Sequence, residues 1–157
     1  MATYTGQTNY QSFTVPQSQS DYQGIALKLK KAGTPPNDLI ITILNDSDGL
    51  PDAGSPVANA SFTIAPGDVT GTLAWIFKNS TNKFSLDADK TYWIRAAMVA
   101  GDSSNRFDWQ YNPYGNYPRG NAYGASGWDF LFKLYYTGKA DASPVQILDV
   151  GYYKRCL

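Results

Sequence analysis

The sequence predicts an all-β protein, a two-sheet antiparallel β-sandwich of jelly-roll type, and three observations support this. Short runs of alternating apolar and polar residues recur along the whole chain, separated by Gly, Pro, Asn and Asp. All 13 acidic residues are Asp, so the strong helix former Glu is absent, while Tyr, Gly and Pro are plentiful. No stretch keeps a helical period over a helix length, and about ten short strands fit a sandwich.

In the first half of the chain, alternation predicts a half-buried strand at 25–29, ended by the Pro-rich turn at 34–38. The run at 39–44, LIITIL, is apolar on both faces and predicts a central strand covered on two sides. Residues 45–56 are rich in Asp, Gly and Pro and predict a long loop. Two more strands are expected at 61–65 and 72–78, the second with Leu73, Trp75 and Phe77 on one side.

In the second half, a turn at 79–82 is expected before a series of shorter strands. Phe130, Phe132, Leu134 and Tyr136 should share one face of a strand, because they alternate with other residues. The expected strands are 84–86, 91–99, 106–111, 128–136 and 144–153. We therefore predict one domain over residues 1–157, with an N-terminal arm at 1–9 and a C-terminal arm or strand at 139–157.

Composition excludes several classes of function. Lys plus Arg and Asp plus Glu both total 13, so there is no basic excess for a nucleic acid or an anionic membrane surface. No apolar run is long enough for a spanning helix, so no membrane insertion is expected. The chain has no His, which removes the commonest general base, and its one Cys, Cys156, cannot form an intrachain disulfide. The N-terminal residues show no secretory signal.

Several fragments, in this order, resemble the carbohydrate-binding-module-like jelly-roll domains of bacterial surface proteins and phage or virus appendages. They are QSF (11–13), GIALKL (24–29), DLIITI (38–43), GLP (49–51), KTYWI (90–94), Trp109, YPRG (117–120) and WDFLFKLY (128–135). The resemblance covers residues 10–137 and implies a non-catalytic domain. We expect the chain to depart from the pattern in two ways, by standing without an attached enzyme or anchor and by having the extra segment 139–157.

The aromatic stretch around residues 109–128 is the candidate glycan site. Sugars pack their C–H faces on Trp and Tyr rings, and nearby polar side chains bind the hydroxyl groups. The candidates are Trp109, Tyr111, Tyr114, Tyr117, Arg119, Asn121 and Tyr123. The alternative is that the ends of this stretch, including Trp109 and Trp128, fill the core, while the middle stiffens a loop or contacts another subunit.

Asp46, Asp48 and Asp52 form a candidate structural calcium site, because a hard cation prefers many oxygen ligands around a Gly-containing loop. The bidentate acid of a complete calcium loop is missing, so the alternative is an Asx-rich turn.

A glycoside hydrolase would need paired carboxylates such as Asp108 and Asp129, but nothing in the sequence places them together. No catalytic residue is therefore predicted.

These observations together predict a non-enzymatic structural or surface subunit, in the first place a virion decoration or appendage protein. Its location would be the virion surface, or alternatively the cell surface or extracellular space. Its partners would be other subunits of the assembly, including copies of itself. The apolar residues of the C-terminal segment (Val145, Ile147, Leu148 and Val150) predict a strand that completes its own sheet or a neighbour's. The alternative function is a glycan-binding module or adhesin.

Overall fold

The computed structural model describes residues 1–3, 7–113, 120–124, 128–137 and 144–146. Within these ranges the chain forms strands and turns with a single 3-10 turn, and no described helix is long and apolar enough to cross a membrane. The prediction of an all-β, antiparallel two-sheet sandwich is confirmed. The elements are β1 (Ala2–Thr3), β2 (Asn9–Thr14), β3 (Gln19–Ala32), β4 (Leu39–Ser47), β5 (Leu50–Ile64), η1 (Pro66–Asp68), β6 (Ala74–Leu86), β7 (Thr91–Met98), β8 (Arg106–Trp109), β9 (Tyr111–Asn112), β10 (Asp129–Phe130), β11 (Phe132–Thr137) and β12 (Pro144–Gln146).

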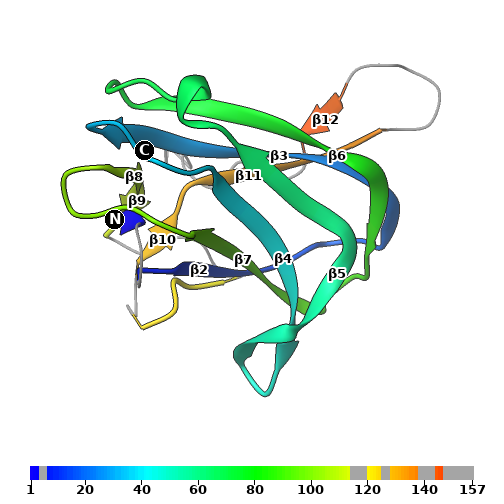
Figure 1. The fold of residues 1–157 in the computed structure, drawn as a ribbon. Coiled ribbons are helices and arrows are strands. Elements are labelled where there is room, and N and C mark those ends of the chain that lie inside the picture. Colours follow the sequence, from blue (N-terminus) through cyan, green and yellow to red (C-terminus); the bar gives the residue numbers. More distant parts are fainter. Residues whose placement is uncertain (4–6, 114–119, 125–127, 138–143, 147–157) are drawn as a thin grey trace, which may run out of the picture.

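Two sheets form the layers of the sandwich (Figure 1). In the six-stranded sheet the long strand β3 pairs with β6 on one side and with β11 and β8, one after the other, on its other side; β12 and β1 add to these. The four-stranded sheet has the order β2-β7-β4-β5. All pairings between named strands are antiparallel, and β9 and β10 form a separate small pair.

The core lies between the inner faces of the two sheets. The expected burial of Phe130, Phe132, Leu134 and Tyr136 is confirmed, because the first three are buried in the core and Tyr136 packs against it. They do not share one strand, since Phe130 belongs to β10 and the other three to β11. The opposite layer supplies alternate residues of β4 and β7, which are Leu39, Ile41, Ile43, Tyr92, Ile94, Ala96 and Met98. The other residues of these strands, such as Thr42 and Arg95, therefore lie on the outer face.

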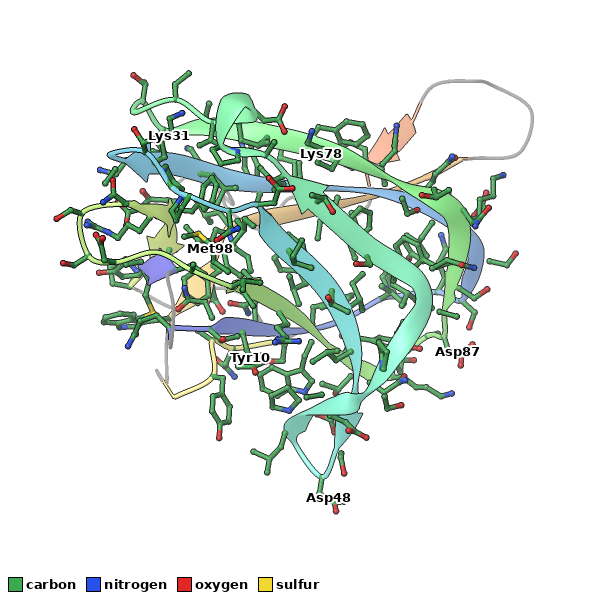
Figure 2. All side chains as sticks on the ribbon, in the orientation of Figure 1. Tyr10, Lys31, Asp48, Lys78, Asp87 and Met98 are labelled. Carbon is green, nitrogen blue, oxygen red and sulfur yellow. The ribbon has the colours of Figure 1, made fainter. Side chains whose placement is uncertain are left out.

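The predicted loop at 45–56 is wrong, because β4 and β5 continue through it as a hairpin. Asp48 and Gly49 both have positive φ, 53° and 81°, as the tight type I′ hairpin turn requires. Asp46 Oδ2 accepts a hydrogen bond from the Gly49 N–H at 2.9 Å and closes the turn. The hairpin tip, marked by Asp48, projects from the body of the protein (Figure 2).

The predicted turn at 79–82 is also wrong, because β6 runs unbroken from Ala74 to Leu86. The Ser80 hydroxyl donates to the carbonyl oxygens of Gln23 on β3, at 3.1 Å, and of Asn82, at 2.6 Å. Opposite this point β3 has register shifts near Gly24, which let both Tyr22 and Ile25 face the core. The polar residues 79–82, whose composition predicted a turn, therefore belong to an irregular stretch of β6 that pairs with β3.

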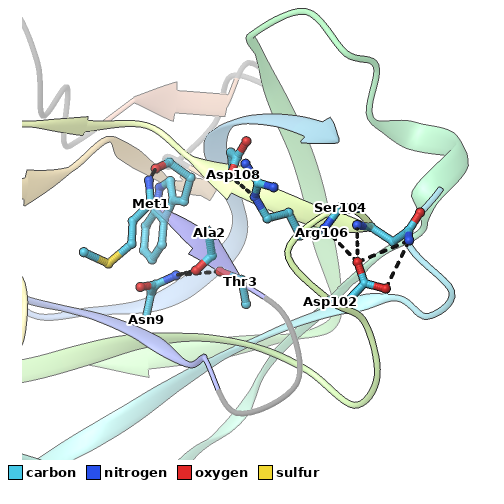
Figure 3. A network of polar contacts seen from close by, with 10 residues as sticks. Met1, Ala2, Thr3, Asn9, Asp102, Ser104, Arg106 and Asp108 are labelled. Carbon is cyan, nitrogen blue, oxygen red and sulfur yellow. Dashed lines mark hydrogen bonds and ion pairs between the residues drawn. The ribbon is translucent and has the colours of Figure 1, made fainter. Parts of the chain in front are cut away.

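The predicted N-terminal arm is partly incorporated in the fold. Strand β1 pairs with β8, and the Met1 ammonium donates to the Trp109 carbonyl oxygen at 2.6 Å (Figure 3). Burial lowers the pKa of this amino group. Asn9 Nδ2 donates to Thr3 Oγ1 at 2.6 Å, which ties β1 to the start of β2.

Of the predicted C-terminal arm, β12 pairs with β11 of the same chain, and residues 139–143 and 147–157 lie outside the described residues.

Tyr22 contributes a pH-dependent part of the stability. Its ring is fully buried, stacked on Phe84 at 5.6 Å, and its hydroxyl has no hydrogen-bond partner among the described residues. Burial, followed by the nearby Tyr136, raises the pKa of Tyr22 to about 12. Because the folded pKa lies above the ordinary value of 10, the stability from neutral Tyr22 is complete below pH 10 and is lost as the pH rises through 12.

We expect Tyr22→Phe to remove this alkaline loss, and to stabilise the protein by up to about 1 kcal/mol at pH 7 because an unpaired buried hydroxyl disappears. The measurement is chemical unfolding of both proteins at intervals from pH 7 to pH 11.5. Tyr123→Phe is the control, since the Tyr123 side chain is exposed and the substitution removes no buried hydroxyl. Parallel pH profiles for wild type and Tyr22→Phe would contradict the assignment.

Candidate functional site

The predicted aromatic site is divided by the fold, and its first member belongs to the core. Trp109 is 1% exposed, and its indole stacks on Phe130 with ring centroids 4.4 Å apart. Its Nε1–H donates to the Leu131 carbonyl oxygen at 2.8 Å. Trp109 is therefore unavailable to a glycan, and the alternative interpretation of this residue as a core residue is correct.

Tyr111 is half-buried and also packs inward. Its ring lies parallel to that of Trp128, with centroids 4.4 Å apart, and both rings pack against the core cluster. A sugar could not use the ring face that Trp128 covers. Three further candidates, Tyr114, Tyr117 and Arg119, lie outside the described residues.

Asn121 and Tyr123 lie beside β2, far in sequence from that strand. The Ser12 N–H donates to the Asn121 carbonyl oxygen at 2.9 Å, and the Tyr123 N–H donates to that of Tyr10 at 3.1 Å. A bridge between Gln11 and Ala122 gives this segment the register of an additional edge strand. The Tyr123 side chain consequently lies on the outer face of the four-stranded sheet, where it is 54% exposed.

Tyr123 forms part of a group that sequence reasoning missed, and that we call the outer-face cluster: Tyr10, Trp93, Arg95 and Tyr123. The Tyr123 ring makes edge contacts with Tyr10 at 5.9 Å and with Trp93 at 6.0 Å. Arg95 is directly opposite Tyr10 in the register of β2 and β7, and two residues from Trp93 on the same face. The signal in the sequence was a strand, TYWIRAAM, that carries Trp and Arg on the face opposite its apolar residues.

The electrostatics of the outer-face cluster are unusual in one respect. The Trp93 indole N–H is satisfied, because it donates to Asp46 Oδ1 at 2.6 Å. Arg95 Nε, in contrast, is buried and has no hydrogen-bond partner among the described residues. A buried donor without a partner is costly, by about 1–3 kcal/mol, and such an atom in a native structure calls for a ligand or another explanation.

The three Asp residues of the predicted calcium site do not form a metal-binding group. Among the described residues there is no cluster of three or more Asp, Glu, His or Cys that could hold a metal ion. Asp46 accepts hydrogen bonds on both oxygens, from Trp93 and Gly49, and Asp52 Oδ1 accepts from the Gly54 N–H at 2.9 Å. Asp48 occupies the exposed hairpin tip. The geometry is that of the Asx-rich turn.

The carboxylates of the remote hydrolase alternative have different surroundings. Asp108 accepts from Arg106 Nε at 2.9 Å on the outer side of the six-stranded sheet (Figure 3). Asp129 is buried, beside Gln11, whose Nε2 is 3.5 Å from Asp129 Oδ1. The same Gln11 accepts from the Phe130 N–H at 2.7 Å, so this polar pair joins β2 to β10 inside the fold. A structural role explains these contacts.

A second exposed surface lies on the outer face of the six-stranded sheet, and we call it the aromatic face: Trp75, Phe77 and Tyr135 with Lys28 and Lys133. Trp75 and Phe77 are 37% and 44% exposed. Phe77 meets the Tyr135 ring edge-on at 4.9 Å, and Lys133 Nζ lies 4.6 Å from the Trp75 ring centroid. Phe77 can lie across β3 because Gly24 has no side chain there; a Cβ would be 2.7 Å from its ring.

Comparisons with known proteins do not identify the chain. No protein-family model matches it, and a search of curated proteins found no significant match. The resemblance to carbohydrate-binding-module-like domains therefore stays a prediction.

Proposed function

We propose that the protein is a non-catalytic structural subunit that assembles with its neighbours on the surface of a larger particle, such as a virion or a phage-like appendage. The observation that carries this proposal is the aromatic face. Large aromatic side chains gathered on the exposed side of a sheet indicate an interaction surface, whereas isolated exposed apolar residues need no explanation. Trp75 and Phe77 are two of the few large apolar side chains exposed among the described residues, and they are close together.

The partner proposed for this face is the β4–β5 hairpin of another copy. The hairpin projects from the domain and carries Leu50, which is 52% exposed, between Asp48 and Asp52 (Figure 2). The aromatic face offers an apolar surface flanked by Lys28 and Lys133. Charge and apolar character are therefore complementary, since an acidic apolar tip would meet a basic apolar sheet. Two aromatic faces meeting symmetrically would instead bring the lysines of both copies into one interface.

A contact between two different surfaces is heterologous and can be repeated from copy to copy. We expect wild type to form concentration-dependent oligomers in sedimentation velocity between 5 and about 200 µM, where weak protein contacts become populated. Phe77→Ser should remove the receiving surface and Leu50→Ser the inserting one, and each variant alone should be monomeric. Because both side chains are exposed, neither change should affect folding.

Mixing these two variants provides the sharpest test. Each variant retains the surface that the other lacks, so an equimolar mixture should form dimers and nothing larger. Val99→Ser, at an exposed residue outside both surfaces, is the matched control and should assemble like wild type. A wild type that is monomeric at all concentrations, or a mixture that stays monomeric, would contradict the proposed contact.

Glycan binding is the second candidate function, and the outer-face cluster favours it. Tyr123 presents an exposed ring, and Asn121 places an exposed amide side chain beside it. A ring and neighbouring polar groups are the elements that a sugar-binding surface requires. This surface lies on the four-stranded sheet and the aromatic face on the six-stranded sheet, so a bound glycan would not cover the receiving surface of the assembly contact.

A further inference from the structure

We infer that the outer-face cluster binds a saccharide that carries a carboxylate, with Arg95 as the residue that selects the acid. This inference rests on the second candidate function, glycan binding. It starts from the unsatisfied Nε of Arg95, which is buried in the four-stranded sheet's outer surface and has no partner among the described residues. The three ion pairs described in the structure involve Lys78, Lys90 and Arg106, and none involves Arg95.

The chemistry of Arg95 favours a carboxylate. A guanidinium presents parallel N–H groups in a plane and binds both oxygens of a carboxylate at once, which gives strength and orientation. In this geometry Nε and one terminal nitrogen donate together. A carboxylate that displaces the groups now covering Nε would supply the acceptor that Nε lacks among the described residues, whereas a neutral hydroxyl group would match only one donor.

The position of the aromatic rings explains why the acid should be part of a sugar. Tyr10 lies between Arg95 and the Tyr123 segment, because it is opposite Arg95 on one side and bonded to Tyr123 on the other. A pyranose packed on the exposed Tyr123 ring could direct a carboxylate across Tyr10 towards Arg95. Neighbouring strands are separated by about 4.8 Å, so the span of two strand spacings is about that of one or two sugar units.

Polyanions in general fit this surface poorly. Asp46 lies in the same region, bonded to Trp93, and the chain as a whole has no excess of basic residues. A nucleic acid would need several phosphate contacts from Lys and Arg. One guanidinium that makes no ion pair among the described residues and lies next to an aromatic ring is instead suited to a single carboxylate on an otherwise neutral or lightly charged ligand.

The test is calorimetric titration of the full chain with matched acidic and neutral saccharides. The pairs are 3′-sialyllactose against lactose, and trigalacturonic acid against its methyl ester, which distinguish a sialic acid from a uronic acid. We expect at least one acid to bind tenfold or more tightly than its neutral partner. Arg95→Gln should reduce the affinity for that acid to the neutral level, and Arg95→Lys should restore only part of it, because Lys has no planar pair of donors.

Two further variants separate the outcomes. Tyr123→Ala should weaken the binding of both members of a pair, because it removes the ring that holds the sugar. Lys30→Gln removes the same charge from the outer face of the other sheet and should have no effect. Equal binding of acidic and neutral sugars would overturn the inference and leave glycan binding intact. No binding of any saccharide would overturn both the inference and the glycan-binding function. If Tyr123→Ala left the affinity for the acid unchanged, the ligand would be held by charge alone, and the inference that a sugar ring packs on Tyr123 would be wrong.

Discussion

Trp109→Ala is expected to lower the free energy of unfolding by about 4 kcal/mol, because it empties a filled part of the core. The side chain is fully buried between the sheets, so its removal leaves a large cavity and deprives Phe130 of its stacking partner at 4.4 Å. It also leaves the Leu131 carbonyl oxygen without the indole donor that now lies 2.8 Å away. The measurement is denaturant unfolding followed by circular dichroism, and the melting temperature should fall by roughly 10 °C.

Trp75→Ala is the matched control for this experiment. Trp75 is the same residue type but is 37% exposed on the aromatic face, so its loss should cost less than about 1 kcal/mol. The comparison also distinguishes the two interpretations of Trp109. If Trp109 were a ligand platform on a loop, Trp109→Ala would resemble Trp75→Ala in stability, and the core assignment would be wrong.

Gly33→Ala is expected to destabilise the protein by about 3 kcal/mol, for two reasons that act together. Gly33 has a φ of +59°, a conformation that costs a residue with a side chain about 1–2 kcal/mol. An added Cβ would also lie 2.3 Å from the Ser104 carbonyl oxygen and 2.6 Å from Asn105 Oδ1. Asn105 Oδ1 already accepts from the Thr34 N–H at 3.0 Å, so the turn after β3 could not move away without losing that bond.

Gly49→Ala separates these two causes, because Gly49 has a φ of +81° but no atom within 4 Å of an added Cβ. This control should cost about 1 kcal/mol, from backbone strain alone. The free energies of unfolding of both variants can be measured by the same denaturant titration. Equal losses at the two positions would show that the close contact with Ser104 is relieved, and would contradict the predicted difference.

The sequence predicted the strands well where alternation coincides with burial on one side. The segments 25–29 and 91–99 were found because each carries apolar residues at every second position, and each of those faces is in the core. The segment 128–136 was found in part, because it is divided at Leu131 into β10 and β11. The hairpin at 45–56 was missed because a long polar strand pair outside the core has no such alternation. Asp48-Gly49 was the available signal, since this dipeptide favours the type I′ turn that joins β4 to β5.

The candidate site was predicted less well, for a related reason. Sequence reasoning grouped aromatic residues that are close along the chain, yet neighbours on one stretch were divided between the core and the surface. Trp109 and Phe130 lie inside, whereas Tyr123 lies outside with Trp93 and Tyr10. Those two partners are on strands far from residue 123, so no local pattern could have placed them beside it.

The sequence alone therefore determined the class of fold and much of the buried face of each strand. The sequence is rich in β-forming residues, and its apolar residues recur at every second position. Packing two sheets face to face is therefore one of the few ways to remove these side chains from water. Only the tertiary structure decided which outward residues became neighbours, because sheet order and register join strands that are distant in the chain. The outer-face cluster with Arg95 and the aromatic face with Trp75 and Phe77 are both products of that register.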